Sequence, residues 1–169
     1  MTLIGQDQPG LVEAIAAVVD QHQGNWEESR MARLAGQFAG ILKIEIETGQ
    51  VAPFKAALEA LTTKGLAVQI VDRASSHSQL ETGRRITLEL VGNDQEGIVH
   101  RIASTLATHE INVESFESSC ESAPWSGEAL FKATAELTAP STLNTEALQS
   151  DLEKIAAELM VDFSLNQSL

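Results

Sequence analysis

The sequence predicts an α+β fold in which a βαββαβ unit occurs twice, with two helices covering one face of an antiparallel sheet in each copy. The first observation is an internal repeat, because at an offset of 87 residues the segment 5–25 aligns with 92–112. The identical pairs in this alignment are Gly5/Gly92, Asp7/Asp94, Gly10/Gly97, Val12/Val99, Ile15/Ile102, His22/His109 and Asn25/Asn112. The second observation is that alternating apolar segments and segments with apolar residues at helical spacing follow in the same order in both copies.

In the first copy, residues 2–6 predict a short opening strand. The helix that follows has an apolar face made of Leu11, Val12, Ile15, Val18 and Val19. Asn25 opens the next strand, and a further strand alternates at Leu42, Ile44 and Ile46. A second helix carries Phe54, Leu58 and Leu61, with Gly65 as its C-terminal stop. A closing strand is predicted over Leu66, Val68 and Ile70.

The second copy repeats this order. Its opening strand alternates at Ile86, Leu88 and Leu90, and its first helix carries Ile98, Val99, Ile102 and Leu106. Two strands, over 112–118 and 130–137, are predicted around a loop that contains Pro124, Trp125 and Gly127. A second helix carries Leu148, Leu152, Ile155 and Leu159, and the last strand alternates at Val161, Phe163 and Leu165.

The order βαββαβ with one apolar face per helix is that of the ferredoxin-like sandwich. Lys43 aligns with Lys132 at an offset of 89, which predicts two inserted residues in the second copy, and the last strands align at an offset of 95. The polar stretch 73–84 separates the copies, so we expect domains at 1–72 and 85–169 joined by this linker. We expect the two domains to pair side by side, and their remaining edge strands to allow a homodimer.

Composition excludes several classes of function. The 169 residues include 11 Lys and Arg against 24 Asp and Glu, a formal charge of -13 that opposes direct binding of nucleic acid. No segment reaches the roughly 20 apolar residues of a membrane helix, and no secretory signal pattern precedes the first strand. The single cysteine, Cys120, cannot form an internal disulfide. We therefore expect a cytoplasmic protein with no membrane partner.

The glycine turns between the first strand and first helix of each copy carry the candidate chemistry. Backbone amides at a helix start lack internal partners and suit a small carboxylate, which glycine allows to approach closely. Asp7 and Asp94 could cap the helices or accept hydrogen bonds from an ammonium group, and Asn25 and Asn112 offer both donors and acceptors. The alternative is purely structural: a tight turn, with asparagine as the left-handed residue that ends the helix.

These turns, Gly5-Gln-Asp7-Gln-Pro9-Gly10-Leu-Val and Gly92-Asn-Asp94-Gln-Glu96-Gly97-Ile-Val, resemble those of the ACT domain, an amino-acid-sensing regulatory module. The resemblance covers nearly the whole chain, twice. It implies ligand sites at interfaces between modules, with candidate residues Asp7, Gly10, Leu11 and Asn25 in one site and Asp94, Gly97, Ile98 and Asn112 in the other. Glu96 departs from the family pattern, which has proline there. Its charge disfavours a carboxylate ligand at the second turn.

Two such modules with nothing else attached resemble the family of glycine cleavage system transcriptional repressors. That resemblance implies a non-enzymatic regulator without a cofactor, with glycine as the expected effector. It implies action through a DNA-binding activator protein, and the acidic charge is compatible with a basic partner. Three alternatives remain: a regulatory subunit of an amino-acid metabolic enzyme, an assembly module with inactive sites, and an RNA-binding ferredoxin-like domain. The last lacks the aromatic strand motif and has the wrong charge.

No other residues predict catalysis or metal binding. Ser75, Ser76 and His77 lie in the polar linker, without the strand-to-helix turn that a nucleophile requires. His22 and His109 stand at equivalent helix ends and have no second ligand at metal spacing, which favours structural roles.

Overall fold

The computed structural model describes residues 1–71, 83–122 and 129–167. The chain divides into two compact units, Met1–Ser76 and His77–Leu169. Most of the predicted linker and the loop with Trp125 lie outside the described residues, as do Ser75, Ser76 and His77.

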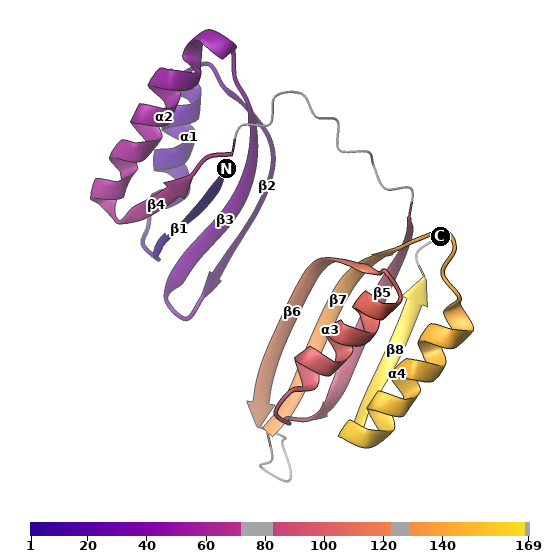
Figure 1. Cartoon of the computed structure of the whole chain (residues 1–169). Helices are drawn as coiled ribbons and strands as arrows, with labels where there is room; N and C mark the ends of the chain where they lie inside the picture. Colours follow the sequence, from indigo (N-terminus) through magenta and orange to yellow (C-terminus); the bar gives the residue numbers. More distant parts are fainter. Residues whose placement is uncertain (72–82, 123–128, 168–169) are drawn as a thin grey trace. The chain divides into compact units, whose positions relative to one another are not determined.

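The first unit is a four-stranded antiparallel sheet with two helices on one face (Figure 1). Its strands are β1 (Thr2–Gln6), β2 (Asn25–Leu34), β3 (Gln37–Glu45) and β4 (Leu66–Gln69), in the spatial order β2-β3-β1-β4. The helices are α1 (Leu11–Gln21) and α2 (Val51–Ala60), and α2 is flanked by 3-10 turns at Thr48–Gln50 and Leu61–Lys64. Gly65 ends this segment in the left-handed conformation, with φ of 79°, as its place in the sequence predicts.

The second unit has the same topology, with the spatial order β6-β7-β5-β8. Its strands are β5 (Arg84–Asn93), β6 (Asn112–Ser122), β7 (Ala129–Ala139) and β8 (Val161–Gln167), and its helices are α3 (Ile98–Thr108) and α4 (Thr145–Leu159). The predicted α+β class and the two βαββαβ units are thus confirmed. β6 and β7 are longer than predicted: β6 continues through exposed residues to Ser122, and β7 reaches Ala139, which is buried in the core.

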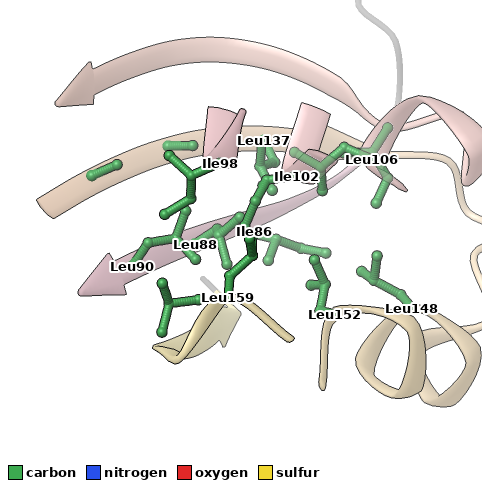
Figure 2. Packing of buried hydrophobic residues seen from close by; sticks show 14 of the residues in the cluster. Ile86, Leu88, Leu90, Ile98, Ile102, Leu106, Leu137, Leu148, Leu152 and Leu159 are labelled. Atoms are coloured by element: carbon green, nitrogen blue, oxygen red, sulfur yellow. The ribbon is translucent and has the colours of Figure 1, made fainter. Parts of the chain in front are cut away.

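Each unit has its own core between helices and sheet. In the second unit the alternating residues Ile86, Leu88 and Leu90 meet the helical residues Ile98, Ile102 and Leu106 (Figure 2). The first unit buries the corresponding set, including Leu3, Ile15, Leu42 and Leu58. Burial of such side chains contributes roughly 1.5–3 kcal/mol each and fixes which face of each sheet lies against the helices.

Strand register corrects one part of the predicted alignment. Leu3 pairs with Gly40 on β3, and the equivalent Leu90 pairs with Ala133 on β7, so the true offset at this strand is 93 rather than 89. Lys43 and Lys132 are therefore not equivalent, and the second copy has six additional residues between its hairpin strands, not two. The predicted offset of 89 and the observed offset of 93 differ by an even number of residues. Side chains alternate between the two faces of a strand, so the error does not change which residues were predicted to face the core.

Candidate functional site

Both candidate turns end in a left-handed glycine that begins a helix. Gly10 has φ of 90° and precedes α1, and Gly97 has φ of 83° and precedes α3. Neither helix start receives a side-chain capping hydrogen bond. No heavy atom lies within 4 Å of the point where a Cβ would stand on either glycine. The space beside both left-handed glycines is therefore open, and it lies next to helix starts, which favour a small anionic group.

A second glycine in each turn serves close packing of the backbone. A Cβ on Gly5 would lie 2.4 Å from the carbonyl oxygen of Gly65, and one on Gly92 would lie 2.6 Å from Val161 Cα. Glycine at these positions lets β1 and β5 approach the strands beside them, β4 and β8. The two glycines of each motif thus have different physical roles.

Asp7 is held by the β2–β3 hairpin. Its amide donates a hydrogen bond of 2.9 Å to the carbonyl oxygen of Gly36. Its carboxylate forms an ion pair with Arg33, with 3.3 Å between Oδ2 and Nη1. Asp7 therefore does not cap the helix. Instead, the exposed guanidinium of Arg33 and the half-buried carboxylate of Asp7 lie side by side next to the first turn.

Asp94 has the same backbone anchor but a different side-chain neighbour. Its amide donates a hydrogen bond of 2.9 Å to the carbonyl oxygen of Ala129. Its carboxylate lies beside the thiol of Cys120. The pKa of that thiol is raised above its usual value of 9.0, first by partial desolvation, then by the charge of Asp94 and a hydrogen bond to it. Among the residues that the structure describes, Asp94 therefore has no cationic partner of the kind that Arg33 provides for Asp7.

Strand register shows that Arg33 and Cys120 occupy equivalent positions. Arg33 pairs with Phe38, which pairs with Gly5. Cys120 pairs with Phe131, which pairs with Gly92. The first turn thus carries one acid and one base, whereas the second carries Asp94, the adjacent Glu96 and an uncharged thiol. We did not identify Arg33 from the sequence, although extending the 87-residue offset through the second strand would have paired it with Cys120.

Leu11 and Ile98 follow the left-handed glycines and are buried, with 6% and 3% of their surface exposed. Their side chains belong to the cores of the two units. Their side chains are therefore not accessible to a ligand at the turns, and the Ile98 amide already donates a hydrogen bond of 3.4 Å to the carbonyl oxygen of Gln95.

Asn25 and Asn112 lie far from the turns of their own units. Asn25 pairs with Glu45 at one end of β3, whereas Gln6, the last strand residue before the turn, pairs with Gln37 at the other end. Eight residues of strand correspond to about 27 Å. Asn25 instead borders a shallow hollow of about 260 Å³ with Gln23 and Glu47. A ligand at the turn could contact Asn25 only if that asparagine came from a different module.

The left-handed residues that follow α1 and α3 are Gln23 and Glu110, with φ of 57° and 56°. Asn25 and Asn112 open strands β2 and β6, so they do not terminate the helices. Asn112 donates a hydrogen bond of 2.7 Å to Glu114.

The two equivalent histidines make side-chain contacts beside α2 and α4. His22 Nδ1 lies 3.5 Å from Gln50 Oε1, and its ring meets Phe54 edge-on. His109 Nε2 lies 3.1 Å from Asp151 Oδ2. Within residues 1–71, 83–122 and 129–167, no group of three or more His, Cys, Asp or Glu residues could hold a metal ion. No helix in the described part of the chain is long and apolar enough to cross a membrane.

Comparison with known proteins extends these observations. A search of curated proteins gives no match. The structure is similar to that of an unknown protein from Galdieria sulphuraria, with a TM-score of 0.86, 28% identity, and coverage of 99% of this chain and 96% of that one. It is also similar to a protein provisionally described as a glycine cleavage system transcriptional repressor, with a TM-score of 0.70, 21% identity, and coverage of 99% and 94%. Residues 1–71 match the ACT domain family. The first unit therefore matches the ACT domain family, and the second unit repeats the fold of the first.

Proposed function

We propose that this protein is a non-enzymatic, cytoplasmic regulator that senses an amino acid, glycine being the expected effector, and acts through a DNA-binding activator protein. The ACT domain over residues 1–71 supports the sensing role. The similarity in fold to a protein provisionally described as a glycine cleavage system transcriptional repressor supports the transcriptional role.

The observation that carries the sensing role is the ion pair beside the open helix start. A free amino acid carries an ammonium group and a carboxylate a few ångströms apart. The Asp7 carboxylate suits the ammonium, while the Arg33 guanidinium and the helix-start amides suit the carboxylate. The open space around Gly10 leaves room for a ligand that has no side chain.

The second turn is a poorer site for the same ligand. Asp94 and Glu96 both repel a carboxylate, and Cys120 supplies no compensating positive charge. We therefore propose that each chain binds amino acid at the first turn only. Binding there would favour one arrangement of modules over another and so alter contact with the partner protein.

The charge of the chain suits a basic partner. Residues 84–169 contain 14 acidic and 5 basic side chains, whereas residues 1–71 contain 8 and 5. The second unit is therefore the proposed contact for a basic DNA-binding protein, since complementary charge accelerates association and favours the correct partner.

Isothermal titration of ligand-free full-length protein with glycine and other amino acids tests the sensing role. We expect one ligand per chain, and at least about 10-fold weaker binding for Arg33→Cys, because a charge-assisted hydrogen bond contributes about 1.5–3 kcal/mol. Arg85→Cys removes an exposed arginine elsewhere and should bind normally. The double variant Cys120→Arg with Glu96→Pro should gain a second site.

Failure of every amino acid to bind the unmodified chain would refute the sensing role. Unchanged affinity in Arg33→Cys would refute the assignment of the site. Capture of binding partners from a cell lysate tests whether the protein acts through a DNA-binding activator. Recovery of a basic helix-turn-helix protein supports this role, and recovery of a metabolic enzyme instead contradicts it.

A further inference from the structure

A hollow of about 360 Å³ lies at the end of the second sheet where β5 begins and β7 leads into α4. Its lining residues are Gly83, Arg84, Pro140, Ser141 and Leu143. Arg84 pairs with Ala139, the last residue of β7, and the Leu143 amide donates a hydrogen bond of 3.0 Å to the carbonyl oxygen of Pro140. The hollow is therefore bounded by a strand end and a hydrogen-bonded turn, and its volume is at the lower end of the range for small-ligand sites.

Arg84 supplies the charge of this hollow. Side chains alternate along β5, so Arg84 lies on the helix-covered side with the buried Ile86, whereas Arg85 lies on the open side. The Arg84 guanidinium donates a hydrogen bond of 2.7 Å from Nη2 to Thr145 Oγ1, at the start of α4. Among the described residues, no carboxylate forms an ion pair with Arg84. The guanidinium is thus positioned by a neutral hydroxyl and keeps its full charge beside the hollow.

The first unit provides an internal comparison, because its own hollow lies at the corresponding end of its sheet, where β3 leads towards α2. That hollow is lined by Gln23, Asn25, Glu45, Ile46 and Glu47. When the offset of 93 between β3 and β7 is continued beyond the strands, Glu47 aligns with Pro140. The first hollow therefore has two carboxylates and no base, whereas the second has an arginine and no carboxylate. Only the second suits an anionic ligand.

We propose that the hollow beside Arg84 binds the phosphate group of a small metabolite. A planar guanidinium can donate two parallel hydrogen bonds to a phosphate. Thr145 Oγ1 accepts a hydrogen bond from Arg84, so its own proton can be donated to a further acceptor, and the Ser141 hydroxyl adds another donor. A phosphate group has three terminal oxygens to accept these hydrogen bonds, one more than a carboxylate has. Pro140 and Leu143 provide an apolar wall for the carbon part of the ligand.

The electrostatic surroundings limit the affinity. Arg84 is exposed, so its attraction for an anion is screened by solvent. Glu146 lies in the first turn of α4 and opposes an anion, although it does not line the hollow. The formal charge of -13 also repels phosphate at long range. For inorganic phosphate alone we therefore expect a dissociation constant of about 1 mM.

Titration of the ¹⁵N-labelled full chain with inorganic phosphate, followed by NMR, tests the site. Ionic strength is held constant with chloride, so that general screening does not change during the titration. The amides of Gly83, Ser141 and Leu143 should shift and saturate together. Arg84→Gln should bind at least about 10-fold more weakly, and Ser141→Ala about 3-fold, because a charged hydrogen bond contributes more than a neutral one.

Arg85→Gln is the matched control, since it removes the same charge from the neighbouring residue on the other side of β5. It should bind phosphate as the unmodified chain does, and circular dichroism should show that each variant is folded. Acetate, titrated in the same way, should bind more weakly than phosphate.

Three results would overturn the proposal. The first is the lack of saturation at these amides, with small shifts spread over the chain, which would mean an adventitious ion only. The second is equal affinity in Arg84→Gln and Arg85→Gln, which would mean that total charge and not the hollow decides binding. The third is acetate binding as tightly as phosphate. No amino acid is present in the titration, so its outcome is independent of the sensing role.

Discussion

Gly5→Ala and Gly10→Ala separate the two roles of glycine in the first turn. A Cβ on Gly5 would stand 2.4 Å from the carbonyl oxygen of Gly65 and 3.2 Å from Leu66 Cα, both backbone atoms. Relieving the first contact requires β1 and β4 to separate by about 1 Å at the point where Gly5 pairs with Leu66. Leu66 is 1% exposed, so this movement also disturbs the core. We expect a loss of about 3 kcal/mol, the upper end for overpacking.

Gly10→Ala adds the same methyl group in open space. Nothing lies within 4 Å of its Cβ position, and the only cost is the positive φ of 90°. That conformation costs a residue with a Cβ about 1–2 kcal/mol. Gly10→Ala should therefore destabilise the first unit less than Gly5→Ala.

Urea unfolding followed by the fluorescence of Trp26 measures both changes, in a Trp125→Phe background so that only the first unit reports. The background protein, carrying both glycines, is the reference for each free energy of unfolding. A smaller loss in Gly5→Ala than in Gly10→Ala would refute the assignment of Gly5 to close backbone packing.

Three further predictions concern local structure. Ala35 has φ of 49° in the two-residue turn between β2 and β3, so Ala35→Asn should stabilise the first unit by about 0.5–1 kcal/mol in urea unfolding; a loss of stability would contradict this. The Asn144 side chain caps α4 by accepting a 3.1 Å hydrogen bond from the Ala147 amide. Asn144→Ala should therefore lower the free energy of unfolding of the second unit by about 1 kcal/mol in urea, and an unchanged unfolding midpoint would argue against the cap. Hydrogen bonds from Lys154 and then His109 hold the pKa of Asp151 below its usual 3.8. Its contribution to stability is therefore present above that pH and lost as pH falls through the lower, folded value. The stability difference between the unmodified chain and Asp151→Asn should shrink as pH falls below 3.8, and a constant difference would exclude this linkage.

Much of the fold could be predicted because local chemistry and tertiary packing agree. Ile86, Leu88 and Leu90 alternate because one face of a strand is buried, and the structure buries all three. Gly65 stops the segment after α2 because only glycine readily adopts its φ. The register of β3 and β7 was not predictable in this way. Alternation repeats every two residues, so alignments that differ by an even number satisfy it equally well.

In the candidate site, too, some features could be predicted from local sequence and others depend on tertiary contacts. The turns with Gly10 and Gly97 were predictable because a helix start after glycine has a local sequence signature. The ion pair of Asp7 with Arg33 joins residues 26 positions apart. It depends on the hairpin that brings β2 back beside the turn. The placement of Asn25 at the far end of the sheet likewise follows from the direction of the strands and not from its distance along the chain.

The sequence by itself determined that two similar halves each build a sheet covered by two helices, because hydrophobic periodicity and glycine placement act over a few neighbouring residues. Only the tertiary structure decided which side chains meet beside the two turns: Arg33 with Asp7 in one half, and Cys120 with Asp94 in the other. These differences arise from hydrogen-bonded register, which is set by the pairing of distant segments. Two copies of one fold thereby acquire different surfaces and different electrostatics at equivalent positions.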